Sequence, residues 1–305
     1  GPFPIPILGN ILHIAMSPLP HRSLAILGQR YGPVLFLRMG STPTIVVSSP
    51  NVARYIFHTH DKVFAGRPHT QTTEHLFYGG DKAAFTSSYG SSWMFVRKLY
   101  TTHILGITSR HIQQLHFPII VDEARHLVRR LYTSNSRDTV PIDLTSCIYT
   151  LAEDIICRLV LRQRAHDLMS PMASSEGGHG GHLSLAKFIE EGASLWGAGL
   201  MGDTIPLLSF LDYTRKRAMN KWFLSFDAIL EPILSRREVE TEAEVATRVS
   251  NGHANDPPPP KDILDVFLAC DPPLHRDMIK EMMLVSIGYI FTILGGLNVC
   301  VCVCF

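Results

Sequence analysis

The sequence has little charge, and the charge it has is balanced. Charged residues make up 18% of the 305 residues, and the formal net charge at pH 7 is +1. A domain that binds DNA or RNA usually carries a strongly basic surface, so nucleic acid is not an expected partner. Hydrophobic residues make up 46% of the chain, which excludes a disordered protein and predicts a substantial buried core.

Short motifs of several common enzyme classes are missing as well. The chain contains no phosphate-binding G-x-G-x-x-G or G-x-x-x-x-G-K-S/T pattern and no G-x-S-x-G of the serine hydrolases. Its 15 histidines include no H-E-x-x-H pair, and we predict no metal site among them. The sequence therefore gives no signal for a nucleotide-dependent, hydrolytic or zinc-dependent site.

The six cysteines do not have the spacing of a disulfide framework. Three stand far apart and three crowd the last six residues: Cys147, Cys157, Cys270, Cys300, Cys302 and Cys304. The terminal group lacks the spacer and the second ligand pair of a zinc site. We therefore expect reduced thiols in an environment that faces the cytosol, and the absence of an N-x-S/T sequon agrees with this expectation.

The N-terminal end lacks a recognisable targeting signal, and the C-terminal end lacks charge. No signal peptide is recognisable at Gly1. At the other end, Met282–Phe305 contains no charged residue over 24 positions, which is long enough to span a bilayer. This leaves open one alternative, a non-catalytic, membrane-associated protein whose C-terminal segment inserts into the membrane.

The residue pattern predicts a mainly α-helical protein with a small N-terminal antiparallel β-sheet. Alternating prolines predict a stiff, extended stretch over residues 1–10. A helix is expected over 20–31, with Leu24 and Leu27 on one face, followed by a hairpin. Its expected strands are residues 34–39 and 44–48, joined by the turn 40–43.

From about Ser91 the apolar spacing becomes helical. The predicted helices are 115–132 with Pro118 in its first turn, 144–161 with Asp143 as N-cap, 185–196 and 214–244. Residues 169–182, rich in Gly, Ser and His, are expected to form a surface loop, and 251–260, with four consecutive prolines, a linker.

Trp93 and Arg97 are the most informative polar pair. Four residues apart on a predicted helix, they project from the same face. An indole N–H beside a guanidinium forms a compact donor site for a carboxylate, which Arg can bind bidentately. The alternative, a cation–π pair or a packed tryptophan, is the commoner role for such a pair and stays open.

Five motifs, in family order, resemble the N-terminal part of a plant microsomal cytochrome P450. They are the proline-rich hinge Gly1–Asn10, Tyr31-Gly32-Pro33, Phe64-Ala65-Gly66-Arg67-Pro68, Tyr89-Gly90 with Trp93 and Arg97-Lys98, and Gly202-Asp203-Thr204-Ile205-Pro206. Lys261–Val266 adds a weaker match. The resemblance implies that residues 1–284 are the N-terminal portion of one P450 domain, and that the uncharged tail 285–305 departs from the family pattern.

The resemblance implies a haem-thiolate monooxygenase that inserts one oxygen atom of O₂ into a small apolar organic substrate. The implied cofactor is haem b, although the loop with the haem-ligating cysteine is absent from this chain. The implied electron donor is the NADPH-cytochrome P450 reductase. The implied location is the cytosolic face of the endoplasmic reticulum membrane, through an N-terminal anchor that the chain does not contain.

The resemblance also assigns site residues. Trp93 and Arg97 are expected to bind the haem propionates. Phe77 and Phe85, in the loop 70–88, are expected near the substrate, with a packing role equally open, and the region 195–211 is a second substrate candidate. No residue is assigned as catalytic or metal-binding, and the chain by itself is expected to be inactive.

Overall fold

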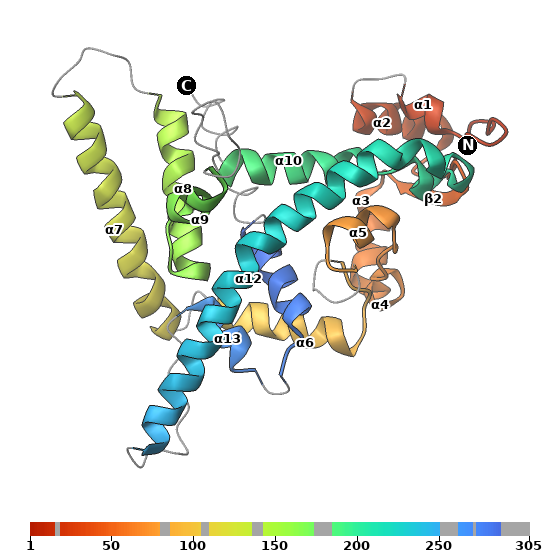
Figure 1. Cartoon of the computed structure of the whole chain (residues 1–305). Helices are drawn as coiled ribbons and strands as arrows, with labels where there is room; N and C mark the ends of the chain where they lie inside the picture. The colour runs from red at the N-terminus through yellow and green to blue at the C-terminus, as the bar shows by residue number, and fades with distance from the viewer. Residues whose placement is uncertain are drawn as a thin grey trace. The chain divides into compact units, whose positions relative to one another are not determined.

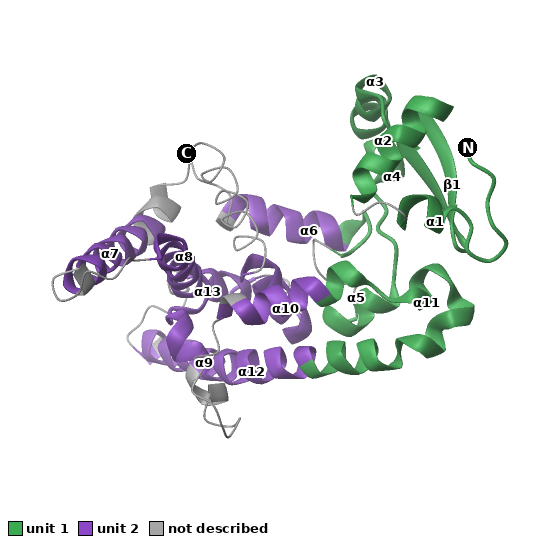
Figure 2. Cartoon of the chain, turned by 90° about the horizontal axis from the view of Figure 1, so that it is seen from above, with its two compact units in different colours: residues 1–81, 86–91, 195–221 green, residues 82–85, 92–194, 222–305 purple. Residues whose placement is uncertain are grey.

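The computed structural model describes residues 1–15, 19–79, 86–104, 110–135, 143–173, 185–250, 262–270 and 273–287 (Figure 1). Helices predominate among these residues, which confirms the predicted mainly α class. The chain divides into two compact units (Figure 2). Unit 1 comprises residues 1–81, 86–91 and 195–221, and unit 2 comprises the remainder.

Unit 1 contains the predicted antiparallel hairpin. Strands β1 (Val34–Met39) and β2 (Thr42–Val47) pair from Val34↔Val47 to Met39↔Thr42. The buried Leu35 and Leu37 pack with Ile14 of helix α1 (Ile11–Ala15) and with Leu24 and Leu27 of α2 (Pro20–Tyr31). The prediction of the helix 20–31 and of its apolar face is confirmed.

The hairpin turn is shorter than predicted. Gly40 and Ser41 form the turn, whereas Pro43, predicted to lie in the turn, lies in β2 opposite Arg38. A proline is tolerated there because both strands of a two-stranded sheet are edge strands, so a missing N–H need not break the ladder. The prediction that residues 40–43 form the connection is therefore wrong by two residues.

The first ten residues are not simply extended. Ile5 and Gly9 exchange two backbone hydrogen bonds of 2.9 and 2.7 Å, which closes a tight turn. The turn is held to the hairpin because the N–H of Asn10 donates to the carbonyl of Arg38, and the N–H of Arg38 donates to Asn10 Oδ1. Pro6 favours this turn through its fixed φ, so the prediction of an extended lead-in is wrong.

Further short helices complete unit 1. They are α3 (Pro50–Arg54), the π-helical turn η1 (Tyr55–Thr59), α4 (Asp61–Phe64), α5 (Gln71–Leu76), α11 (Met201–Thr204) and the 3₁₀ segment η3 (Pro206–Asp212). The hairpin turn contacts α11, where the N–H and Oγ of Ser41 donate to the carbonyl of Thr204 at 2.8 and 2.9 Å. A Cβ at Gly40 would lie 2.4 Å from that oxygen, so glycine is required at this close approach.

The remaining helices belong wholly or mostly to unit 2. They are α6 (Ser91–Leu99), the π-helical η2 (Tyr100–Ile104), α7 (Arg110–Asn135), α8 (Leu144–Leu161), α9 (Ala165–Ala173), α10 (Leu185–Ala198), α12 (Tyr213–Ser250) and α13 (Ile263–Leu268). A last helical stretch covers residues 276–287. The last four residues of α10, 195–198, and the first nine of α12, 213–221, belong to unit 1.

Two of these helices correct the sequence predictions. Helix α7 begins at Arg110, so Pro118 lies inside the helix and not in its first turn. Helix α9 extends to Ala173, so the predicted surface loop does not begin at Met169, and the rest of that loop lies outside the described residues. By contrast, α8 has the predicted bounds, and the side chain of Asp143 accepts from the N–H of Ser146 as the predicted N-cap.

An aromatic stack forms part of the core of unit 2. Phe188, Trp222 and Phe226 stack with centroid distances of 5.1 and 5.6 Å between successive rings, and Trp222 Nε1 donates to the carbonyl of Phe188 at 2.8 Å. Gly192 lies against the indole, because a Cβ there would be 2.3 Å from a ring carbon. Large aromatic side chains that bury both faces contribute strongly to core stability.

The beginning of the uncharged C-terminal segment is buried in unit 2. Met282 and Met283 are fully buried, and Leu284 and Ile287 are nearly so. The residues from 288 onward lie outside the described part. Among the helices that the structure describes, none combines the length and the apolar character that a membrane span requires.

A buried charge pair fixes α13 to α12. Arg237, only 7% exposed, donates to Asp262 at 2.6 Å and to Asp265 at 2.9 Å. Asp262 also caps α13 by accepting from the N–H of Asp265 at 2.8 Å. Removing one partner of a buried ion pair leaves the other charge desolvated and uncompensated, which is strongly destabilising.

We predict that Arg237→Met lowers the free energy of unfolding by about 3–5 kcal/mol. The neighbouring Arg236→Met is the matched control, because Arg236 is exposed and its contact with Glu240 is a surface pair worth at most about 1 kcal/mol. Urea unfolding followed by circular dichroism measures both values. Equal losses for the two variants would contradict the prediction.

Candidate functional site

Helix α6 carries the Trp93–Arg97 pair within unit 2. Val96 and Leu99 are buried and fix one face of the helix in the core. Trp93 is half-buried and Arg97 is exposed, and Arg97 Cζ lies 4.9 Å from the centroid of the Trp93 ring. The pair therefore adopts the cation–π arrangement, which was the alternative to a carboxylate site.

The stacked arrangement and carboxylate binding do not exclude each other. A guanidinium has its N–H groups in its own plane, so a face-on contact with an indole leaves them directed past the ring. Stacking also restricts the rotamers of a long side chain, so less entropy is lost when an anion binds. The donor set of Trp93 and Arg97 fits the carboxylates of a haem, the prosthetic group that the sequence resemblance implies.

Two of the three described cysteines, Cys157 and Cys270, do not fit the iron of such a group. Cys157 is fully buried in α8, and burial raises the pKa of its thiol far above the ordinary value. Burial also raises the pKa of Cys270, whose Sγ donates to the carbonyl of Val266. Because a metal ligand must be the thiolate, neither environment favours iron ligation. Cys300, Cys302 and Cys304 lie outside the described residues. Among the described residues, no group of three or more His, Cys, Asp or Glu side chains could hold a metal ion.

Phe77, the expected substrate contact, lies at the end of α5 in unit 1. Its ring meets Trp196 of α10 edge to face, with centroids 5.7 Å apart and an interplanar angle of 78°. Phe85 lies outside the described residues. The two regions proposed separately as substrate candidates, 70–88 and 195–211, thus contact each other through an aromatic pair.

The beginning of α5 is held by a carboxylate from α11. Asp203 accepts from the N–H of Gln71 at 2.7 Å, from the N–H of Thr72 at 3.4 Å and from Thr72 Oγ1 at 2.5 Å. Thr70 and Thr73 form a capping box that satisfies the third N–H of the helix. Thr72 Oγ1 in turn accepts from the N–H of Leu200 at 3.1 Å, so the contact is made in both directions.

A second aspartate holds α11 in the same way. The carboxylate of Asp212, which is almost fully buried, accepts from the N–H groups of Met201 and Gly202 at 3.0 and 2.7 Å. The donors at the start of a helix have no acceptor within it, so a carboxylate both satisfies them and interacts favourably with the helix dipole. Asp212 therefore fixes the position of α11, which carries Asp203, and Asp203 fixes the start of α5.

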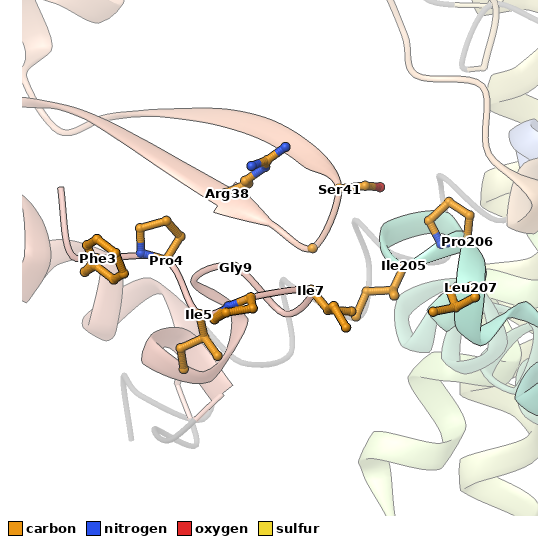
Figure 3. A pocket seen from close by; sticks show the side chains of 12 residues that line it. Phe3, Pro4, Ile5, Ile7, Gly9, Arg38, Ser41, Ile205, Pro206 and Leu207 are labelled. Atoms are coloured by element: carbon orange, nitrogen blue, oxygen red, sulfur yellow. The ribbon is translucent and has the colours of Figure 1, made fainter.

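A shallow apolar groove lies elsewhere in unit 1 (Figure 3). It has a volume of about 530 Å³. The hairpin turn, the N-terminal turn and the start of η3 line it, with Ile7 and Leu207 among the side chains that Figure 3 labels. Phe3, Ile7 and Leu207, which line the groove, are more than 60% exposed, as is Phe210, one 3₁₀ turn after Leu207. We call these four residues the Ile7–Leu207 patch.

The sequence analysis missed the roles of Thr72, Trp196 and Asp203. Asp203 belongs to one of the family motifs and Trp196 to a candidate substrate region, but no local pattern links either residue to α5. The spacing of Thr70 and Thr73 is that of a capping box and could have placed the start of the helix. No such signal in the sequence identifies Asp203 of α11 as the acceptor of the first N–H groups of α5.

Comparisons with known proteins show which family the chain belongs to. The family model described as Cytochrome P450 matches residues 1–285. Cytochrome P450 750A1 of Pinus taeda is 34% identical over 269 residues, covering 88% of this chain and 47% of that protein. Flavonoid 3'-monooxygenase of Petunia hybrida is 30% identical over 258 residues, covering 82% and 46%. The chain thus spans about half the length of the curated relatives it matches.

A solved structure has the same fold at lower sequence similarity. A zebra fish cytochrome P450 determined with progesterone superposes with a TM-score of 0.64 at 19% identity, over 90% of this chain and 57% of that one. The family model covers nearly all of the chain, and the Pinus taeda relative exceeds 30% identity over most of it. The chain belongs to the cytochrome P450 family.

Proposed function

We propose that the whole protein is a haem-thiolate monooxygenase that inserts one oxygen atom of O₂ into a small apolar organic substrate. The observation that carries the proposal is the match of residues 1–285 to the family, together with the Trp93–Arg97 pair on one face of α6. Electrons would come from NADPH through the NADPH-cytochrome P450 reductase. The cofactor would be haem b.

The residues of this chain would bind and orient, and the bound haem would supply the oxygen chemistry. Trp93 and Arg97 would donate hydrogen bonds to the haem propionates, with the guanidinium held in place by the indole. Phe77 and Trp196 would present apolar surface to the substrate and exclude water. Phe85 is proposed for the same role on the basis of the resemblance alone.

We predict that Arg97→Ala weakens haem retention in a chain completed with the C-terminal half of a relative. Each charge-assisted hydrogen bond is worth about 1.5–3 kcal/mol, so the haem dissociation constant should rise about tenfold or more. Transfer of haem to apomyoglobin measures the change. Lys98→Ala is the control, because Lys98 is an exposed cation next to Arg97. Unchanged retention in Arg97→Ala would refute the propionate role.

We predict that the 305-residue chain alone does not turn over substrate. Of its three described cysteines, Cys157 and Cys270 do not favour the thiolate that iron ligation requires, because burial raises the pKa of both thiols. The measurement is the absorption spectrum of the reduced chain with added haem and carbon monoxide, together with product formation in the presence of NADPH and reductase. A thiolate-type maximum with product formation would overturn this prediction.

We also propose that unit 1 contacts a membrane at the cytosolic face of the endoplasmic reticulum. The Ile7–Leu207 patch supports this proposal, because a cluster of large exposed apolar side chains is unusual on a surface that faces only water. Ile7 has φ +68°, a strained value for a β-branched residue, and its side chain is 66% exposed.

We predict that Leu207→Ser with Phe210→Ser lowers binding to phosphatidylcholine vesicles at least about tenfold, since each buried apolar side chain contributes about 1.5–3 kcal/mol. Leu224→Ser with Val239→Ser is the control, because these side chains of α12 are equally exposed but lie in unit 2. Flotation measures the bound fraction. Alkaline carbonate should release the chain, and resistance to carbonate would instead favour insertion of the segment Met282–Phe305.

A further inference from the structure

We propose that Asp203 is a positioning residue that holds Phe77 against Trp196 and so sets the shape of the apolar surface offered to the substrate. This inference rests on the proposed monooxygenase function for its last step, the effect on substrate. Its first step, the coupling of α5 to α11, rests only on contacts within unit 1. All the residues that carry it are described, and all lie in that unit.

Helix α5 cannot hold its own orientation. It has six residues, and a helix of this length is not stable without outside contacts. Its first-turn donors show where the support comes from. The N–H of Thr73 is bound by Thr70 Oγ1, whereas those of Gln71 and Thr72 are bound by the carboxylate of Asp203. The position of Asp203 therefore determines where α5 begins.

Three other hydrogen bonds join α5 to the same region, and each has an uncharged oxygen as its acceptor. Thr72 Oγ1 accepts from the N–H of Leu200, His75 Nδ1 lies 2.8 Å from Asn220 Oδ1, and Ser209 Oγ donates to Gln71 Oε1 at 3.4 Å. Hydrogen bonds to an ionised acceptor are about twice as strong as those between neutral groups. Asp203 therefore provides the strongest of these attachments.

Phe77 follows the helix directly. Its N–H donates to the carbonyl of Thr73, so a shift or rotation of α5 moves the Phe77 ring with it. Trp196 lies on the other side of the contact, seven residues before Asp203 in the chain, and the N–H of Asp203 donates to the carbonyl of Leu200 between them. Asp203 thus links the segments that carry both rings.

The coupling can be measured in the 305-residue chain itself. In Asp203→Asn the carboxylate is replaced by an amide with only one acceptor oxygen, and we expect hydrogen exchange at Gln71 and Thr72 to become about tenfold faster. In protein labelled with 5-fluorotryptophan, the ¹⁹F resonance of Trp196, assigned by Trp196→Phe, should shift in the same direction as in Phe77→Leu. The resonances of Trp93 and Trp222 should stay in place and report an intact fold.

Two pairs of variants test whether the effect is specific to the contact between Asp203 and Thr72. Asp61→Asn removes an exposed carboxylate from the first turn of α4, also in unit 1, and should change neither measurement. Thr72→Val removes the hydroxyl that bonds both Asp203 and Leu200 and should reproduce the effect, whereas Thr72→Ser keeps the hydroxyl and should not. An unchanged Trp196 resonance in both Asp203→Asn and Thr72→Val would overturn the coupling.

The effect on substrate is tested in a chain completed with the C-terminal half of a relative. Asp203→Asn should raise KM about tenfold for an apolar substrate, with little change in kcat and with an unaltered spectrum of the carbon monoxide complex. A wild-type KM in a variant whose Trp196 resonance has moved would overturn the positioning role. Absence of the thiolate-type spectrum from the unmutated completed chain would refute the proposed function instead, and would leave the coupling standing on the measurements above.

Discussion

The N–H groups that begin α5 and α11 must find acceptors outside their own helices, and two aspartates provide them. Asp212 binds the first N–H groups of α11, and Asp203 of α11 binds those of α5. Both helices are too short to be stable alone, so their placement follows from these carboxylates. The aromatic contact between Phe77 and Trp196 depends on that placement. Local backbone chemistry in unit 1 thereby determines the geometry of its apolar surface.

The two candidate binding elements differ in how they are supported. Trp93 and Arg97 lie on one helix, α6, whose buried Val96 and Leu99 fix its orientation in unit 2. Their relative position follows from helical periodicity alone. Phe77 and Trp196 come from different helices and meet only because long-range hydrogen bonds hold their backbones. Two residues on one helix suit a polar site for a rigid, charged group. Two residues held together by long-range hydrogen bonds suit a surface that must match a particular substrate shape.

The parts of the fold that the sequence could predict are those with local signals. Helix α8 has the predicted bounds because Asp143 caps its start and Arg162, in a left-handed conformation, ends it. Trp93 and Arg97 could be paired by spacing, but whether they stack depends on rotamers that the sequence does not reveal. Pro43 was misplaced because proline is acceptable on an edge strand, and Asp203 contacts Thr72 across 131 positions with no local pattern to signal it.

The composition of unit 1 has a consequence for synthesis on the ribosome. Residues 1–81 cannot complete their contacts until residues 195–221 have been made, and the hairpin turn meets its acceptor, Thr204, only after 163 further positions. At 5–20 residues per second, the intervening chain takes on the order of ten seconds to appear. During that interval the nascent hairpin and α5 expose apolar side chains that later become buried. Apolar surface exposed in this way makes a nascent chain prone to aggregation until its remaining partners have been made.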